Sequence, residues 1–303
     1  MLFILLLILF PVTVFCQLVT STADTITAKF NLIENGAKLQ LISSRFSFTE
    51  GPAVDQKGNI FFTDQPNNKI WEYDTAGKLS VFLDKTGRSN GLYFNRKGNL
   101  IACADEHDQL WSISPKKKIK VLVKDLDGKL LNGPNDLWVD GKDGIYITDP
   151  YYQRDYWTRK KPDINGQKVY YLPRGKKELV VVADNLQQPN GIVGTPDGKF
   201  LFVADIQADK TYKYEIQADG TLTNRQLFTA KGSDGMTIDE QGNIYLTGNG
   251  VTIFDPQGKQ LAHIDIPEKW TANLCFGGKN KNELFITASE GIFLLKMNVK
   301  GVE

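Results

Sequence analysis

A short pattern of residues occurs six times along this chain. Each copy opens on a polar residue, continues through a short apolar stretch and a turn, and ends in a second apolar run, as in "EGPAVDQKGNIFFTD" at 50–64. The opening positions lie 39–55 residues apart and are Glu50, Asn90, Asn135, Asn190, Asp234 and Asn273. A strand-rich repeat of about 40–45 residues is typical of one blade of a β-propeller.

The pieces of each repeat predict four antiparallel strands. Turns with Gly separate the first two strands, and alternating aromatic runs such as "KIWEYD" and "TYKYEI" mark the third. The last repeat has only three strands, so we expect residues 37–46 to supply the fourth and to close the ring. The prediction is an all-β, six-bladed β-propeller over residues 36–303. A β-sandwich would explain the strands but not six repeats in register.

The N-terminus and the composition restrict the compartment and the partners. Residues 1–16 are apolar without a charged side chain, shorter than the roughly 20 residues of a membrane span. They predict a signal peptide, with residues 17–35 as a lead-in to the domain, and therefore a secreted or periplasmic location. A retained N-terminal anchor is the alternative. The 36 Lys and Arg nearly balance the 35 Asp and Glu, which argues against nucleic acid or, after removal of the signal, a membrane as partner. The sequence does not specify an oligomeric state.

The six opening residues predict a metal site. First strands of propeller blades line the central channel, so their starting residues should meet at one mouth of it. An Asn or Asp before Gly is also an ordinary turn signal, but turns do not explain Glu50 or the common phase. The six side chains offer carboxylate and amide oxygens, which suit Ca²⁺. Mg²⁺ and Mn²⁺ fit less exclusively, and Zn²⁺ could substitute in vitro, although it usually takes His or Cys.

Other catalytic chemistries find no support in the sequence. There is no Gly-x-Ser-x-Gly elbow, P-loop or dinucleotide fingerprint. His107 and His263 are the two histidines, and neither is placed at the channel mouth. Cys103 and Cys275 lie in apolar runs and are expected to be buried free thiols. Metal-assisted polarisation of a carbonyl, or activation of water, remains.

At these residues the chain resembles the gluconolactonase and regucalcin family of six-bladed lactonases, from about Phe46 to Val299. The motifs that carry the resemblance are "TEGP" at 49–52, "NGPND" at 132–136, "QPNGI" at 188–192, "SDGM" at 233–236 and "CFGG" from 275. The resemblance implies that Glu50, Asn190 and Asp234 hold one divalent ion. It further implies that Asp234 is the general base, and that Asn135 binds substrate or metal-bound water or is a fourth ligand.

The chain departs from the family at one position and carries one long insertion. Regucalcin-like members carry an Arg that contacts the sugar where this chain has Gly133. Residues 150–167 form a long insertion in the third repeat, expected to overhang the metal. Its Tyr151, Tyr152, Tyr156 and Trp157 could stack on a sugar ring, and its Arg154 and Arg159 could meet an acid group; the alternative is a surface loop that packs on itself. Asp149 is a weaker candidate for a second acid or ion site.

The leading hypothesis is therefore a metal-dependent hydrolase that opens a sugar lactone. A phosphotriesterase of the diisopropylfluorophosphatase type would use the same ligands, because a phosphoryl oxygen can be polarised as a carbonyl oxygen can. A non-catalytic binding propeller, stabilised by a structural ion, is the alternative from a different class of function.

Overall fold

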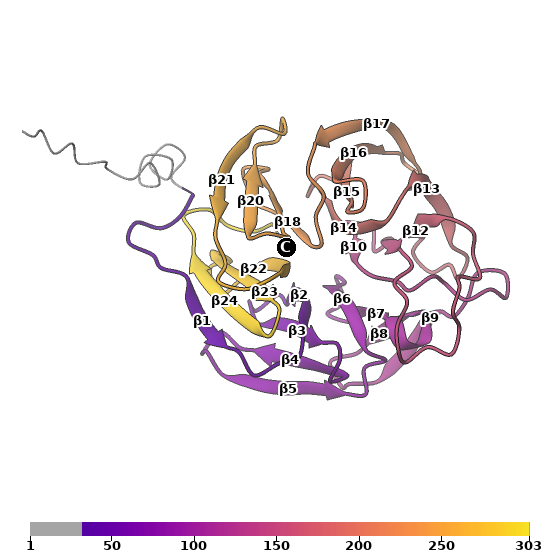
Figure 1. Cartoon of the computed structure of the whole chain (residues 1–303), viewed down its shortest axis with the longest axis horizontal. Helices are drawn as coiled ribbons and strands as arrows, with labels where there is room; N and C mark the ends of the chain where they lie inside the picture. The colour runs from indigo at the N-terminus through magenta and orange to yellow at the C-terminus, as the bar shows by residue number, and fades with distance from the viewer. Residues whose placement is uncertain (1–31, 303) are drawn as a thin grey trace, which may run out of the picture.

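The computed structural model describes residues 32–302, and these form six four-stranded antiparallel sheets around a central axis (Figure 1). The prediction of an all-β, six-bladed propeller is confirmed. The described residues also include one short 3₁₀ helix, η1 (Asp105–His107). No helix within residues 32–302 is long and apolar enough to cross a membrane. The predicted signal peptide at 1–16 lies outside the described residues.

Each blade runs from an inner strand at the channel to an outer strand at the rim. The inner strands are β2 (Thr49–Val54), β6 (Ser89–Phe94), β10 (Leu137–Val139), β14 (Pro189–Gly194), β18 (Met236–Ile238) and β22 (Thr271–Gly277). The second strands are β3 (Ile60–Asp64), β7 (Leu100–Ala104), β11 (Ile145–Asp149), β15 (Phe200–Asp205), β19 (Ile244–Leu246) and β23 (Glu283–Ala288). The third strands are β4 (Lys69–Tyr73), β8 (Gln109–Ile113), β12 (Gln167–Leu172), β16 (Lys210–Ile216), β20 (Val251–Phe254) and β24 (Gly291–Lys296). The outer strands are β5 (Leu79–Asp84), β9 (Ile119–Val123), β13 (Val180–Leu186), β17 (Leu222–Thr229), β21 (Gln260–Ile264) and β1 (Gln40–Ser43).

An N-terminal strand completes the last blade, as predicted. Strand β1 pairs antiparallel with β24, with Gln40 opposite Leu294 and Leu41 opposite Phe293. The chain just before it also packs on this blade, because Leu32 is buried and Ile33 forms a bridge with Met297. The last blade is thereby built from both ends of the chain.

Acidic and amide side chains stabilise the hairpins between first and second strands. Asp55 Oδ1 accepts the backbone N–H groups of Lys57 and Asn59 at 2.8 and 2.9 Å. Gly58 lies at a φ of +90°, a conformation that favours glycine. Asn95, Asp140 and Asp239 make the corresponding bonds in blades two, three and five. These Asx turns fix the hairpin register and therefore the face each inner-strand side chain takes.

Aromatic side chains fill the space between neighbouring blades. Phe61 of blade one packs edge-on against Phe94 of blade two, with ring centroids 5.0 Å apart. The indole of Trp138 occupies the space beside Gly194, where a Cβ would lie 2.3 Å from the ring. Each cluster of apolar side chains between blades is therefore formed by residues from two neighbouring blades.

The junction that closes the ring gives a test of this packing. Phe46 follows β1, is buried, and packs edge-on against Phe62 and Trp71 at centroid distances of 5.2 and 5.4 Å. Phe46→Ala should lower the free energy of unfolding by about 3–5 kcal/mol, because it leaves a cavity at the junction. Leu41→Ala on β1, whose side chain is 56% exposed, should change it by about 0.5 kcal/mol or less. Urea unfolding of both variants measures this; equal effects would mean that the junction is not tightly packed.

Candidate metal and active site

The six predicted ring residues lie at the same end of the channel. Glu50, Asn90, Asn190 and Asn273 sit within the first residues of their inner strands, while Asn135 and Asp234 each lie two residues before the start of theirs. In four blades the pairing register shifts at this point, between Glu50 and Ala53 in the first and between Ser89 and Leu92 in the second. Such bulges redirect side chains out of the regular alternation. The geometry thereby brings polar side chains from all six blades to the axis.

Glycines after the ring residues allow this convergence. A Cβ on Gly51 would lie 2.1 Å from the carbonyl oxygen of Asn90, and one on Gly91 would lie 2.6 Å from that of Asn135. A Cβ on Gly235 would meet the Asn273 side chain at 2.0 Å. The glycines are thus needed for close approach of neighbouring inner strands, and only Gly51 of these three also has a positive φ, +42°. The turn interpretation of the Asn-Gly and Asp-Gly pairs does not describe these positions.

A cavity of about 240 Å³ opens at this mouth. It combines ring residues with side chains from three loops. Its lining residues are Phe48, Glu50, Gln65, Asn90, Asn135, Tyr152, Arg154, Asn190, Ile206, Asp234 and Trp270. All four predicted metal ligands are therefore brought together, along with Tyr152 and Arg154 of the insertion.

Two carboxylates in this cavity interact unfavourably with one another. Glu50 is buried, and burial, with the charges of Asp234 and Asp136, raises the pKa of its carboxyl well above the ordinary value. Burial likewise raises the pKa of Asp234 to about 6, opposed by hydrogen bonds from Trp270 and Asn190. The Trp270 Nε1–H donates to Asp234 Oδ2 at 2.6 Å. Both acids are held together in a poorly solvated place, which a cation would stabilise.

The amide of Asn190 also fits a cation. Its Nδ2 donates to the Tyr152 hydroxyl at 2.9 Å, so its oxygen is fixed in orientation. Asn190 Oδ1 is buried and has no hydrogen-bond partner within residues 32–302. An unpartnered carbonyl oxygen beside two carboxylates matches the hard oxygen donors of Ca²⁺ and Mg²⁺. In the described chain no cluster contains three or more His, Cys, Asp or Glu side chains suited to a metal, so amides would have to complete the ligand set.

The insertion is held over the cavity by Asp105 of η1. Asp105 Oδ2 accepts the Arg154 Nε–H at 2.9 Å and a hydrogen bond from the Tyr156 hydroxyl. The Trp157 Nε1–H donates to the backbone oxygen of Asp105 at 3.0 Å. The Trp157 ring fills the space next to Gly133, where a Cβ would lie 2.8 Å from it. This packing explains why a glycine, and no larger residue, stands at 133.

Two residues that we assigned to the substrate do not line the cavity. Trp157 is buried in the contacts just described, and the Tyr151 hydroxyl donates to Gln153 Oε1 at 2.7 Å. Arg159 is also engaged elsewhere, because it pairs with Asp108. These side chains hold the insertion in place, and the assignment of Tyr151 and Trp157 to substrate binding stays a prediction.

The other candidate residues from the sequence make contacts that support the fold or lie outside the cavity. Asp149 accepts the backbone N–H groups of Asn132 and Gly133, each at 2.9 Å, and so fixes the loop before Asn135. His107 and His263 are exposed, and neither lines the cavity. Cys103 and Cys275 are buried free thiols, as expected.

Sequence reasoning missed Asp136 and Trp270. Asp136 is buried, raises the pKa of Glu50 and accepts a hydrogen bond from Asn273 Nδ2 at 3.4 Å. Its signal was visible, because it follows Asn135 where Gly follows the ring residue in blades one, two, four and five. Trp270 comes from the loop between β21 and β22, which has no repeat signal.

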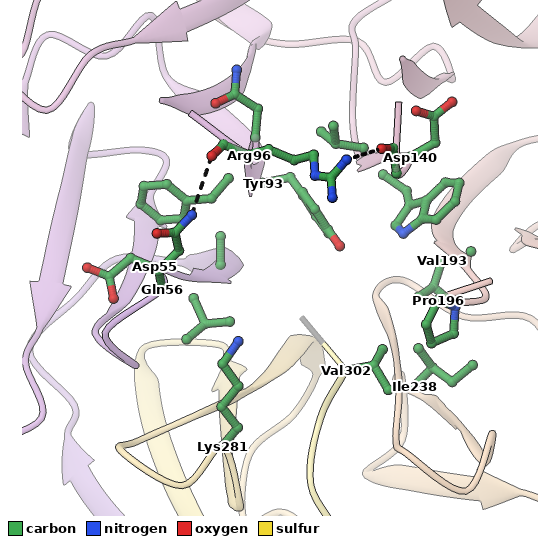
Figure 2. Close-up of a pocket in the computed structure, with 18 residues that line it drawn as sticks. Asp55, Gln56, Tyr93, Arg96, Asp140, Val193, Pro196, Ile238, Lys281 and Val302 are labelled. Atoms are coloured by element: carbon green, nitrogen blue, oxygen red, sulfur yellow. Dashed lines mark hydrogen bonds between the residues drawn. The ribbon is translucent and has the colours of Figure 1, made fainter. Parts of the chain in front are cut away.

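A second cavity, of about 350 Å³, lies at the opposite ends of the inner strands (Figure 2). Tyr93, Arg96 and Val302 lie around it, so the C-terminal segment helps to form this side. Its Asp55 and Asp140 carboxylates are used by the hairpin turns, and Arg96 Nη1 donates to the Gly141 carbonyl. The ring carboxylates and amides are therefore confined to the first mouth.

The fold and site define a six-bladed propeller with a buried set of carboxylate and amide side chains at one channel mouth. The chain belongs to the SMP-30/Gluconolactonase/LRE-like family, whose model matches residues 48–290. It is 28% identical to a gluconolactonase of Zymomonas mobilis, over 89% of this chain and 84% of that one. It is 26% identical to the diisopropyl-fluorophosphatase of Loligo vulgaris, over 80% and 85%. The solved structure of a gluconolactonase from Xanthomonas campestris superposes with a TM-score of 0.82 at 26% identity, covering 89% of this chain and 92% of that chain.

The raised pKa of Asp234 predicts a pH-dependent stability when a chelator is present. Between the unfolded value of 3.8 and the folded value of about 6, the folded protein binds a proton that the unfolded chain releases. This proton uptake stabilises the folded state at low pH, and the stabilisation is lost as the pH rises through about 6. Asp234→Asn removes this titrating group. From pH 4 to pH 8, the free energy of unfolding of the variant should therefore rise by on the order of 1–3 kcal/mol relative to that of the wild type.

Urea unfolding with chelator at both pH values measures this difference. Asp265→Asn, in the same blade with a fully exposed side chain, is the matched control and should show no such gain. An Asp234→Asn effect that is the same at pH 4 and pH 8 would contradict the raised pKa.

Proposed function

We propose that this protein is a divalent-cation-dependent lactonase that opens a sugar lactone of the gluconolactone type. The observation that carries the proposal is the group formed by Glu50, Asp234 and the unpartnered Asn190 oxygen at the floor of an accessible cavity. The similarity to gluconolactonases over most of both chains supports the same reaction class.

Four residues would hold the cation: Glu50, Asn190 and Asp234, with Asn135 as a fourth ligand or as a contact to ion-bound water or substrate. Ca²⁺ is the expected ion, because the donors are all oxygens, and Mg²⁺ or Mn²⁺ are the alternatives. When bound, the cation supplies a Lewis acid that polarises the lactone carbonyl and stabilises negative charge on its oxygen.

Asp234 is the proposed general base. Its carboxylate accepts a proton from a water molecule while the water oxygen bonds to the lactone carbonyl carbon. The ring C–O bond then breaks, and the proton returns from Asp234 to the departing alkoxide oxygen, which gives the open hydroxy acid. The Trp270 Nε1–H fixes Asp234 Oδ2, so the carboxylate keeps one orientation during both transfers.

The insertion would bind the rest of the substrate. Tyr152 and Arg154 line the cavity above the ring residues, and Tyr152 also orients Asn190. Asn135 lies on the loop fixed by Asp149. Together they would hold the lactone with its carbonyl towards the ring carboxylates and would exclude bulk water from that side.

Removal of the cation gives the direct test. With Ca²⁺ present, the protein should hydrolyse D-glucono-δ-lactone, and chelator should reduce the rate by at least about 100-fold because the carbonyl is no longer polarised. Asp234→Asn should reduce kcat by at least about 100-fold while thermal unfolding stays cooperative. A pH-stat assay measures both, with Asp265→Asn as a control of full activity. Equal rates with and without chelator, or a fully active Asp234→Asn variant, would refute the mechanism.

A phosphotriesterase is the second candidate, favoured by the similarity to the diisopropyl-fluorophosphatase over most of both chains. The ligand set cannot distinguish a carbonyl from a phosphoryl oxygen, so paraoxon belongs in the same assay. A Ca²⁺-dependent rise in the unfolding temperature without turnover of lactones or paraoxon would instead indicate a binding propeller with a structural ion.

A further inference from the structure

Arg154 is the only cationic side chain among the residues that line the cavity, and the protein uses only part of it. Its Nε–H donates to Asp105 Oδ2 at 2.9 Å. Within residues 32–302 its two terminal amino groups make no hydrogen bond, although the side chain is only 23% exposed. A guanidinium edge with two free donors is therefore available at the cavity.

Surrounding groups hold this guanidinium in one orientation. Asp105 is 3% exposed, and its Oδ2 also accepts hydrogen bonds from Gln65 Nε2, at 3.2 Å, and from the Tyr156 hydroxyl. The guanidinium carbon lies 5.5 Å from the centroid of the Tyr152 ring. Burial lowers the pKa of Arg154, but the charge of Asp105, the hydrogen bond to it and the neighbouring Tyr156 and Tyr152 together outweigh burial and raise the pKa, so the group stays charged. A fixed, charged donor pair costs little entropy when it binds a ligand.

The negative charge of Asp105 does not prevent Arg154 from binding an anion. Its carboxylate already accepts three hydrogen bonds through Oδ2, and Asp105 is not among the residues that line the cavity. Arg154 lines the same cavity as Asp234, Asn190 and Glu50. A ligand held by its carbonyl at the ring residues would present its other substituents to Arg154.

Two parallel N–H donors match the two oxygens of a carboxylate, and such pairs are about twice as strong as neutral hydrogen bonds. We propose that the substrate is an acidic sugar lactone, one that carries a second carboxylate away from the reacting carbonyl, and that Arg154 binds this carboxylate. The inference rests on the proposed lactonase function and specifies its substrate class. Aldaric acid monolactones have this chemistry.

A matched pair of lactones tests the proposal. D-glucono-1,4-lactone and D-glucaro-1,4-lactone differ at C6, which is a hydroxymethyl group in the first and a carboxylate in the second. The wild type should prefer the acidic lactone in kcat/KM by about tenfold or more. Arg154→Gln should lower kcat/KM for the acidic lactone by about 100-fold, mostly through KM, and for the neutral one by less than about threefold.

Two further variants separate recognition from structure. Arg154→Lys keeps the charge but loses the paired donors, so its preference should be intermediate. Arg88→Gln is the matched control, because Arg88 packs on the Tyr156 ring of the same insertion but does not line the cavity. It should leave both rates within about twofold of the wild type. Thermal unfolding of each variant checks that the fold is retained.

Calorimetry with D-glucarate and D-gluconate in the presence of Ca²⁺ tests Arg154 even if no lactone is hydrolysed. A tighter binding of glucarate that Arg154→Gln removes would support the inference even though the lactonase proposal had failed. Equal kcat/KM for the two lactones in the wild type, or equal affinity for the two acids when nothing is turned over, would overturn it. An equal loss of kcat/KM for both lactones in Arg154→Gln would also overturn the inference.

Discussion

The close approach of six inner strands to one axis is the constraint on which the site depends. Neighbouring strands come so near that a single methyl group at Gly51 or Gly235 would collide with the next blade. In four blades the glycine directly follows the polar ring residue, so the close strand approach occurs where that residue reaches the channel mouth. The same convergence that packs the centre of the propeller therefore concentrates oxygen atoms there.

That concentration is electrostatically unfavourable for the protein alone. Glu50 and Asp234 each have a raised pKa, chiefly because both are poorly solvated, and the charge of Asp136 adds to the effect on Glu50. A core selected only for stability would not keep an unpartnered amide oxygen beside two acids. Local conflict of this kind is typical of functional sites, where a ligand supplies the missing interaction.

Much of this arrangement could be predicted because it repeats. Six registered polar positions and six Gly-containing turns indicate the blade number, the closing strand and the ring of polar side chains without any knowledge of packing. Features that occur once could not be found in this way. Trp270 reaches Asp234 from a loop that carries no repeated sequence signal, and the position of Trp157 depends on the space left by a glycine 24 residues earlier. Aromatic residues in the insertion look alike in sequence, so only the fold separates Tyr152 at the cavity from Tyr151 and Trp157 in the support.

The pairing of β1 with β24 has a consequence for how the chain reaches this state. Gln40 must find Leu294, so the blade they share cannot form until nearly the whole polypeptide has left the ribosome. Contacts so distant in sequence carry a large loop-closure entropy and slow the search for the native topology. During synthesis the first blade would keep an exposed apolar face until the last blade forms. The risk of aggregation is therefore greatest before the ring closes.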